Sequence, residues 1–586
     1  MKAAAVLCVA FHVWLIFAGL LSNLVSRPLH IALALPFVFV FTSAPRSVLG
    51  RLIDGAWFLI GLVGCLYIAL NHVALDDQYG RIANGWQMAL GVGLLALALE
   101  MARRHVKWAL PAVALLALLY GLFGDALPGE LGHPGLPLES FIGTLVITEG
   151  GLWGQLTGVS VDVVAIFVIL GAMIGAGEAG RGFMAAAVAL AGRRRAGAAK
   201  VSVVASAMFG TISGSASANV ASTGAVTLPA MKRLGYPAPM AGAVEAVASS
   251  GGQIMPPVMG AGAFIMVELL RTTYPQIMAA ALLPAVLFFF AVWAGCDLYG
   301  RRYRLEPMRA RDIPPLRDVA WLIAFFLTPF AVLLTLLFAT GVTPQYAGAS
   351  AAAVAAGLLL VDATLRASLS RWAWRLLEAC EIAARQIAVI ASIILCAGIV
   401  IGVLNLTGLG VKITSLIVGL SGGNLWVALA LTGLACLILG MEVPTTAAYV
   451  ICISVAGPAL QDLGLPALHA HLFVFWYALL STITPPVCGT VFIAAGMVGA
   501  NWLRVAGHAM VLGIGLYLVP LAFIANRSLI MLADAPVMAV LAFIKIAAGL
   551  GLISMALVGG LAGSSSTPVR VALGAVGLVV IFAFGI

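Results

Sequence analysis

Two short stretches interrupt long apolar segments of the chain, one in each half. The first is Ser250-Gly-Gly-Gln-Ile-Met-Pro-Pro257 and the second is Ser481-Thr-Ile-Thr-Pro-Pro486. Glycine-rich or Pro-Pro backbone leaves amide and carbonyl groups without helical partners. Lipid tails cannot hydrogen-bond to such groups, so at membrane depth each break must be lined by protein, water or a bound solute.

The composition places these segments in a membrane. Of the 586 residues, 63% are hydrophobic and only 9% are charged, whereas a soluble domain carries about 25% charged residues. Apolar segments near the length that crosses a bilayer recur roughly sixteen times, although some are too short or interrupted to cross fully. The first, residues 3–25, follows Lys2 and lacks a convincing cleavage site, so we expect a retained helix and not a signal peptide.

The charges and cysteines exclude several classes of function. The net charge is +9, but Arg and Lys gather in short loops, as cytoplasmic loops of membrane proteins require, so nucleic-acid binding is not indicated. Eight Cys lie singly in apolar stretches without a CxxC pair, which indicates buried apolar residues. There is no phosphate-binding loop motif and no soluble domain long enough to bind ATP. Energy must come from a gradient or from a partner.

Loop charges predict the orientation of the N-terminal third. Basic residues at 46, 51, 103, 104 and 107 mark the inside, whereas 71–79 and 124–139 are expected outside. Residues 1–123 then form five helices, the first four as a small bundle. Residues 124–157 form an external, partly amphipathic linker rich in Gly and Pro.

The block 158–300 is predicted to contain a re-entrant hairpin. A helix at 158–177 leads inward to Arg193-Arg194-Arg195. The apolar segment 200–229 has positive charge at both ends, so both ends belong in the cytoplasm and the segment must dip in and return. Its centre, 210–224, is small and hydroxylated. A span at 240–270, broken at 251–257, then crosses outward, and one at 276–298 returns.

A second block repeats this order in the opposite direction. Residues 301–386 hold a basic loop, a helix pair (318–339 and 345–363) and a basic cytoplasmic segment. The block 387–530 then has a helix at 387–404, a hairpin at 425–460 centred on Gly440 to Thr446, a broken span at 467–497 and a helix at 507–525. Matched breaks in inverted repeats are typical of secondary transporters. Residues 531–586 form two more helices of unassigned role.

The predicted fold is therefore an all-α polytopic membrane protein with inverted repeats, two re-entrant helical hairpins and two broken helices. A half-helix that ends inside the membrane presents free N–H groups to anions and free C=O groups to small cations. Oxygen ligands suit Na⁺ better than a transition metal, although single small residues also serve close helix packing. The candidates for binding substrate and ion are Ser213, Gly214, Ser215, Ser217, Asn219, Thr223, Glu245, Ser250, Gly251, Gly252, Gln253, Pro256, Pro257, Gly440, Glu442, Pro444, Thr445, Thr446, Ser481, Thr482, Thr484, Pro485 and Pro486.

Charged residues inside the membrane are costly and point to function. Glu245 lies about one and a half helical turns before the first break, where it could be a proton site, the partner of a basic residue, or a group facing a cytoplasmic cavity. Glu442 lies in the second tip. We expect Lys412 at the membrane interface and Lys545 to reach the interface by extending its side chain.

Two other functions fit the sequence less well. An intramembrane serine protease could use Ser213, but no His is placed convincingly opposite that tip to act as a general base. A channel also uses re-entrant loops, but channels seldom need paired inverted breaks in one chain.

Seven motifs resemble a tripartite ATP-independent periplasmic (TRAP) transporter permease, DctM-like, in the fused form that joins small and large membrane subunits (4TM/12TM) and works with TAXI-class binding proteins. The resemblance covers roughly residues 1–530. The motifs lie at 199–206, 214–220, 241–259, 405–410, 444–449, 470–475 and 484–486.

The resemblance implies an elevator-type importer of the bacterial inner membrane and not an enzyme, without a cofactor. The hairpins and broken helices would move against a scaffold that includes residues 1–123. A periplasmic TAXI-type protein would deliver a small organic anion, such as 2-oxoglutarate or glutamate, and a Na⁺ or H⁺ gradient would drive uptake. An ion-coupled anion carrier without a binding protein is the alternative. Glu442, where the family pattern has glycine, and Cys488-Gly489-Thr490 depart from that pattern.

Overall fold

The computed structural model describes residues 1–583 except 20, 42–46, 441–443, 487 and 560–565. Within these ranges the chain is helical and contains no strand, and an isolated bridge joins Val361 to Ala367. Ten of the described helical segments are long and apolar enough to cross a membrane. The prediction of an all-α polytopic membrane protein is confirmed.

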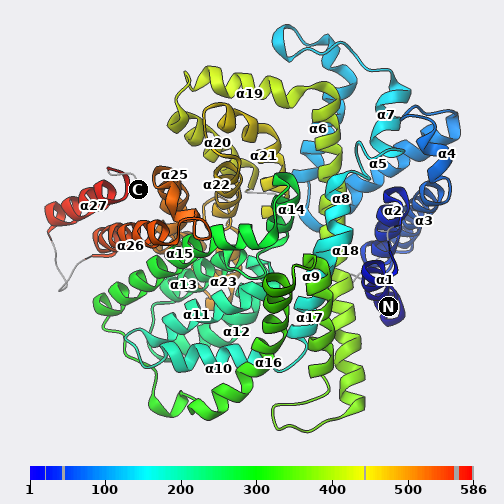
Figure 1. Cartoon of the computed structure of the whole chain (residues 1–586). Coiled ribbons are helices and arrows are strands. Elements are labelled where there is room, and N and C mark those ends of the chain that lie inside the picture. Colours follow the sequence, from blue (N-terminus) through cyan, green and yellow to red (C-terminus); the bar gives the residue numbers. More distant parts are fainter. Residues whose placement is uncertain (20, 42–46, 441–443, 487, 560–565, 584–586) are drawn as a thin grey trace.

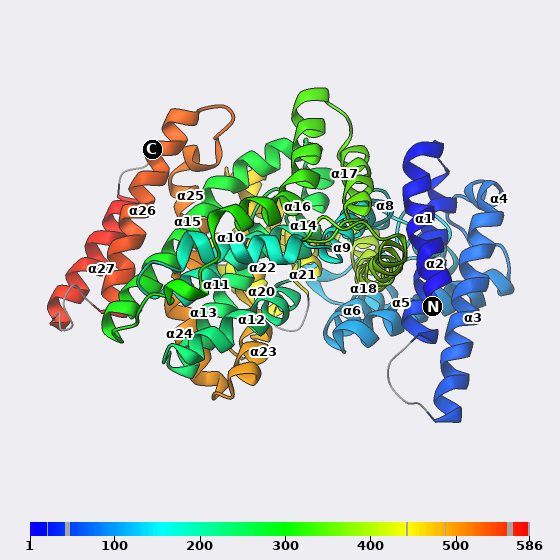
Figure 2. The ribbon, with the colours of Figure 1, turned by 90° about the horizontal axis from the view of Figure 1, so that it is seen from below.

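The N-terminal helices pack against one long central helix. They are α1 (Lys2–Ala18), α2 (Asn23–Leu35), α3 (Val48–Leu70), α5 (Gly85–Val106) and α6 (Ala109–Phe123). The first helix ends earlier than expected, because Gly19 has a φ of +96°, which helical backbone cannot adopt. Four of these helices (α1, α2, α5 and α6) contact α18 (Leu369–Thr407), and they lie at one end of the molecule (Figure 2).

Helix α18 is longer than the sequence suggested. It has 39 residues and begins at Leu369, so most of the expected cytoplasmic segment 366–385 is helical. Ser368 caps this helix by accepting a hydrogen bond from the amide of Arg371, and neither Gly nor Pro occurs before Gly398. A helix of this length spans about 58 Å, almost twice the hydrocarbon thickness, so basic residues on its first half can lie outside the membrane without a loop.

Two series of helices follow the same order. The first is α9 (Ala165–Gly175), α10 (Ala179–Ala191), α11 (Gly197–Ser213), α12 (Ala216–Arg233), α13 (Ala238–Gly251), α14 (Ala261–Leu270) and α15 (Tyr274–Arg302). The second is α18, α19 (Leu409–Leu420), α20 (Leu425–Gly440), α21 (Thr445–Asp462), α22 (Ala467–Leu480), α23 (Gly489–Val498), α24 (Trp502–Leu512) and α25 (Ile514–Ala525). In each series a helix pair with a short connection precedes a helix that is interrupted in its middle.

The two interrupted helices pack head to tail. The half before the first break, α13, contacts the half after the second break, α23, and α22 likewise contacts α14. The second helix of each pair follows the same rule, since α12 contacts α23 and α21 contacts α14. This reciprocal packing is what two repeats of opposite direction produce.

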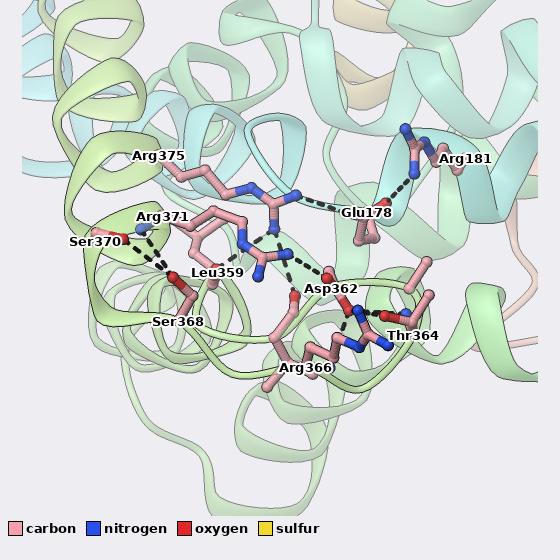
Figure 3. A network of polar contacts seen from close by, with 12 residues as sticks. Glu178, Arg181, Leu359, Asp362, Thr364, Arg366, Ser368, Ser370, Arg371 and Arg375 are labelled. Atoms are coloured by element: carbon pink, nitrogen blue, oxygen red, sulfur yellow. Dashed lines mark hydrogen bonds and ion pairs between the residues drawn. The ribbon is translucent and has the colours of Figure 1, made fainter.

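A polar network anchors the turn between α9 and α10 (Figure 3). Arg375 of α18 donates to Glu178 in this turn, at 2.5 Å, and its guanidinium also lies 3.4 Å from the carbonyl of Val361. In the adjoining loop, Asp362 accepts hydrogen bonds from Thr364 and pairs with Arg371. These hydrogen bonds, first that from Thr364, hold the pKa of Asp362 well below its usual range.

Two further helices, α26 (Pro536–Val558) and α27 (Thr567–Phe582), pack on each other, and α26 packs on α15. They lie at the end of the molecule opposite the N-terminal helices (Figure 1). Lys545, which we expected to extend to the interface, is partly buried, and its ammonium donates to Asn526 Oδ1 at 2.8 Å. Lys412, which we expected at the membrane interface, donates to the carbonyl of Gly132.

Candidate functional site

Close glycine contacts bring the first helix pair against the first break. A Cβ added to Gly210 of α11 would lie 2.1 Å from the Cα of Gly252, which leaves no room for any side chain. At the tip, Gly214 has a φ of +57°, and its Cβ would lie 3.2 Å from the Cα of Gly260. Glycine is needed at both positions, because the two backbones touch directly.

The second pair meets the second break in the same way. A Cβ on Gly440, the last residue of α20, would lie 2.8 Å from Ser481 Oγ and 3.0 Å from the carbonyl oxygen of Ala478. Each tip therefore packs against the break of its own series.

The two breaks also meet each other. Thr482 Oγ1 donates to Ser250 Oγ at 2.9 Å, although the two residues lie 232 positions apart. Thr490 Oγ1 lies 3.3 Å from Ser250 Oγ and donates to the carbonyl of Thr482 at 2.6 Å. The breaks thus form one hydroxyl-rich centre, to which Thr490 belongs although it was noted only as a departure from the family pattern.

Protein groups satisfy part of the interrupted backbone. The amide of Gly260 donates to the carbonyl of Gln253 at 3.1 Å, and the amide of Thr490 donates to the carbonyl of Thr482 at 3.3 Å. Tyr274 Oη donates to the carbonyl of Pro257 at 2.5 Å. Both breaks carry a cis Pro–Pro peptide bond. These contacts match the requirement that broken backbone at membrane depth finds partners other than lipid.

Glu245 lies beneath the first break inside a cage of hydroxyl groups. Its side chain is fully buried. It accepts hydrogen bonds from Ser202 of α11 at 2.7 Å and from Ser249 of its own helix at 3.2 Å. Thr223 and Thr227 of α12 also donate to it. Within the described residues no basic side chain pairs with it, so two of the three interpretations, a basic partner and a cavity-facing group, do not fit.

A periodic signal in the sequence could have found this cage. Ser202 and Ser206, Thr223 and Thr227, and Glu245 and Ser249 are each four residues apart, the spacing that places two side chains on one helix face. Of these residues only Thr223 and Glu245 are among the candidates predicted from the sequence. Asn219, also selected, completes the group: its Nδ2 donates to the carbonyls of Ser206 at 2.9 Å and Ser249 at 3.3 Å.

The other candidates divide into four groups. Ser215 caps α12 by accepting from the amide of Ala218, Ser217 is exposed, and Pro444 is the residue before α21. Thr484 donates to the carbonyl of Leu480 and lies 2.8 Å from Tyr517 Oη, so it faces α25 and not the centre. Glu442 and the side chain of Ser213 lie outside the described residues. Candidates at the breaks and second tip with no side-chain hydrogen bond that defines a role are Gly251, Gln253, Pro256, Thr445, Thr446, Pro485 and Pro486.

The chain is similar in sequence to known proteins. The sequence model of the tripartite ATP-independent periplasmic transporter, DctM component, matches residues 93–538, which include both helix pairs and both breaks. A C4-dicarboxylate TRAP transporter large permease protein DctM of Pseudomonas aeruginosa is 26% identical over 342 residues, which make up 57% of this chain and 77% of that protein. An isethionate TRAP transporter permease protein DctMQ of Oleidesulfovibrio alaskensis is 23% identical over 345 residues, 58% of this chain and 52% of that protein.

A protein named YgiK of Salmonella typhimurium is 25% identical over 355 residues, 59% of this chain and 77% of that protein. Members of the matched family are multi-pass proteins of the bacterial inner membrane that carry organic acids and work with a periplasmic substrate-binding protein. The match covers well over half of the chain, together with the paired breaks that the structure brings into contact. The chain therefore belongs to the DctM component family of tripartite ATP-independent periplasmic transporters.

Proposed function

We propose that this permease imports a small organic anion, a dicarboxylate such as 2-oxoglutarate or an acidic amino acid, and that an ion gradient drives the import. The observation that carries the proposal is the hydrogen bond between Ser250 and Thr482, which joins the two breaks into one centre. The named relatives carry a C4-dicarboxylate and isethionate, which are both organic anions.

The anion would be held mainly by backbone amides and hydroxyl groups. Neither the tips nor the breaks contain Lys or Arg: residues 210–224, 250–260, 440–446 and 481–490 have no basic side chain. The helices α14 and α23 both begin just after a break, and the free N–H groups at a helix N-terminus favour a carboxylate.

Glu245 is the group that we assign to ion coupling, as a proton carrier. Hydroxyl groups from three helices contact both carboxylate oxygens directly, so a proton can be added without moving them apart, whereas a cation at an oxygen would have to displace them. The cage joins α11 and α12, the helices of the first pair, to Glu245 of α13. The protonation state of Glu245 would therefore change the packing of this pair against the broken helix. Na⁺ bound at the tips is the competing assignment, and Glu442→Gly should then change Na⁺ dependence more than folding.

The mobile unit would contain the helix pairs and broken helices, and the scaffold would contain α1, α2, α3, α5, α6, α9 and α16 to α18. Here α16 (Leu316–Thr335) and α17 (Pro344–Leu358) pack on each other, and α17 packs on α9. A TAXI-type periplasmic protein would deliver the substrate. The domain limits used above, 1–123, 124–157, 158–300, 301–386, 387–530 and 531–586, are part of this proposal.

Uptake into proteoliposomes tests the function. Labelled 2-oxoglutarate and glutamate would be offered with and without a purified TAXI-type protein, under an imposed H⁺ or Na⁺ gradient. We expect uptake that requires the protein and the H⁺ gradient. Uptake at full rate with every gradient collapsed would refute ion coupling, and uptake without the protein would establish the binding-protein-independent carrier instead.

A further inference from the structure

The connection between α6 and α7 (Leu138–Val146) is an ordered loop on the expected external face. Figure 1 shows it at the top of the molecule beside α19, at the end opposite the loops that follow α15 and α17. His133 fixes the two ends of the loop. Its ring Nε2 lies 3.0 Å from the carbonyl of Tyr120, and its Nδ1 accepts a hydrogen bond from the amide of Gly135 at 3.1 Å. Tyr120 Oη donates to the carbonyl of Leu131 at 2.7 Å. The loop is thus fixed by its own hydrogen bonds.

The tip of this loop is exposed and acidic. Every residue from 125 to 131 is exposed, including Leu127 and Leu131, which are 45% and 40% exposed. Asp125 and Glu130 lie in the tip, and there is no Lys or Arg between Lys107 and Arg181. Within the described residues neither carboxylate forms an ion pair. A surface with apolar side chains beside such carboxylates fits a partner that presents basic residues around an apolar patch.

The same loop contacts α19, which packs against the second helix pair. Lys412 of α19 donates to the carbonyl of Gly132, and its ammonium lies 3.5 Å from Tyr120 Oη. Helix α19 packs along α21, where Thr414 Oγ1 lies 3.4 Å from the carbonyl of Val455. Helix α21 is the second helix of the pair whose tip contacts the second break. A displacement of the loop would therefore act on α19 and, through it, on the pair at the site.

We propose that residues 125–131 dock the periplasmic binding protein, and that Lys412 passes this docking to the second helix pair. The inference rests on the proposed function, because it needs a binding protein as partner. It assigns a surface and a connection that uptake by itself does not require: docking through Asp125 and Glu130, and transmission through Lys412.

The test separates docking from transmission. The ligand is the purified TAXI-type protein that supports uptake by the wild-type permease. Its dissociation constant for the permease in detergent, and the concentration that gives half-maximal uptake, would be measured for the double variant Asp125→Lys/Glu130→Lys. The matched control is Asp76→Lys/Asp77→Lys, which makes the same charge change on exposed residues of the other expected external loop.

We expect both quantities to rise at least about tenfold in Asp125→Lys/Glu130→Lys, since reversed charges in an interface cost more than the ~1.4 kcal/mol that a tenfold change represents. The Asp76→Lys/Asp77→Lys control should stay near wild type. Lys412→Met should leave the dissociation constant unchanged, which also shows that the variant is folded, and should lower maximal uptake about fivefold or more. Lys412→Arg, which keeps a cationic donor, should recover it.

Equal affinities in the two charge-reversal variants would overturn the docking surface while leaving the proposed function intact. Normal maximal uptake in Lys412→Met would overturn the transmission step. A wild-type permease that binds no TAXI-type protein would refute both the partner in the proposed function and the docking surface.

Discussion

Gly210→Ala gives the most direct test of how the first helix pair meets its break. The added Cβ would lie 2.1 Å from the Cα of Gly252 and 2.8 Å from its carbonyl carbon and oxygen. Non-bonded carbons prefer about 3.5 to 4.0 Å, so α11 must move away from the break by more than about 1 Å. All three contacted atoms belong to the backbone, and backbone cannot move aside as a flexible side chain can.

The expected loss exceeds the helical gain from alanine. Overpacking of this kind costs about 1–3 kcal/mol, and the shift would also stretch the hydrogen bond from Ser202 to Glu245, worth about 1 kcal/mol or more. Alanine returns at most about 1 kcal/mol of helix propensity. A net loss of about 2 kcal/mol corresponds to a roughly thirtyfold shift away from the packed pair.

The assay is uptake in proteoliposomes together with thermal unfolding in detergent. Gly507→Ala in α24 is the matched control, because a Cβ there meets no atom within 4 Å. We expect Gly210→Ala to lower the unfolding temperature and to reduce uptake at least tenfold. Gly507→Ala should lower neither the unfolding temperature nor uptake. If the two variants behaved alike, the close approach of α11 to the first break would be refuted.

Three further predictions follow from the charged groups. Glu245→Gln keeps one acceptor oxygen but cannot gain or lose a proton, so uptake should lose its dependence on the H⁺ gradient; flux that still rises with that gradient would reject the assignment. Arg375→Met leaves buried Glu178 with only an exposed partner and should destabilise the fold by about 3 kcal/mol, whereas a variant that also carries Glu178→Met should recover much of the loss in thermal unfolding. Asp362 has a depressed pKa. Its contribution to the stability of the fold is therefore present above the unfolded aspartate pKa of about 3.9 and is lost as pH falls through its lower folded pKa. Hydrogen exchange of residues 359–371, corrected for intrinsic rates, should show protection below pH 4 in wild type but not in Asp362→Asn.

The sequence predicted most of the architecture because hydrophobic length and loop charge are local properties. The two helix pairs, both breaks and the order of the two series follow from apolar runs interrupted by Gly, Ser and Pro. The predicted helix start at 387 was wrong for the same reason: the basic residues before it indicate the side of the membrane but do not interrupt a helix, and the helix begins at Leu369. A helix start can be read from the sequence only where a helix-disfavouring residue such as Gly or Pro stands near it. Within α18 the first such residue is Gly398, far from the start at Leu369.

Side-chain partners depended on the tertiary structure. The motif around Glu245 was visible, but its surroundings come from three helices, and Ser202 lies 43 residues from it. Thr490 joins the centre through Ser250, 240 residues away, and Lys545, in the middle of α26, donates to Asn526 at the end of α25.

By itself, then, the sequence determined that the chain crosses the membrane, where its helices are broken and which family motifs it carries, since each of these depends on neighbours along the chain. Only the tertiary structure decided that the two breaks touch, that Glu245 is enclosed by hydroxyl groups and that Lys412 ties α19 to the loop between α6 and α7. These contacts join residues tens to hundreds of positions apart, and the packing of antiparallel repeats, not any local preference, selects them.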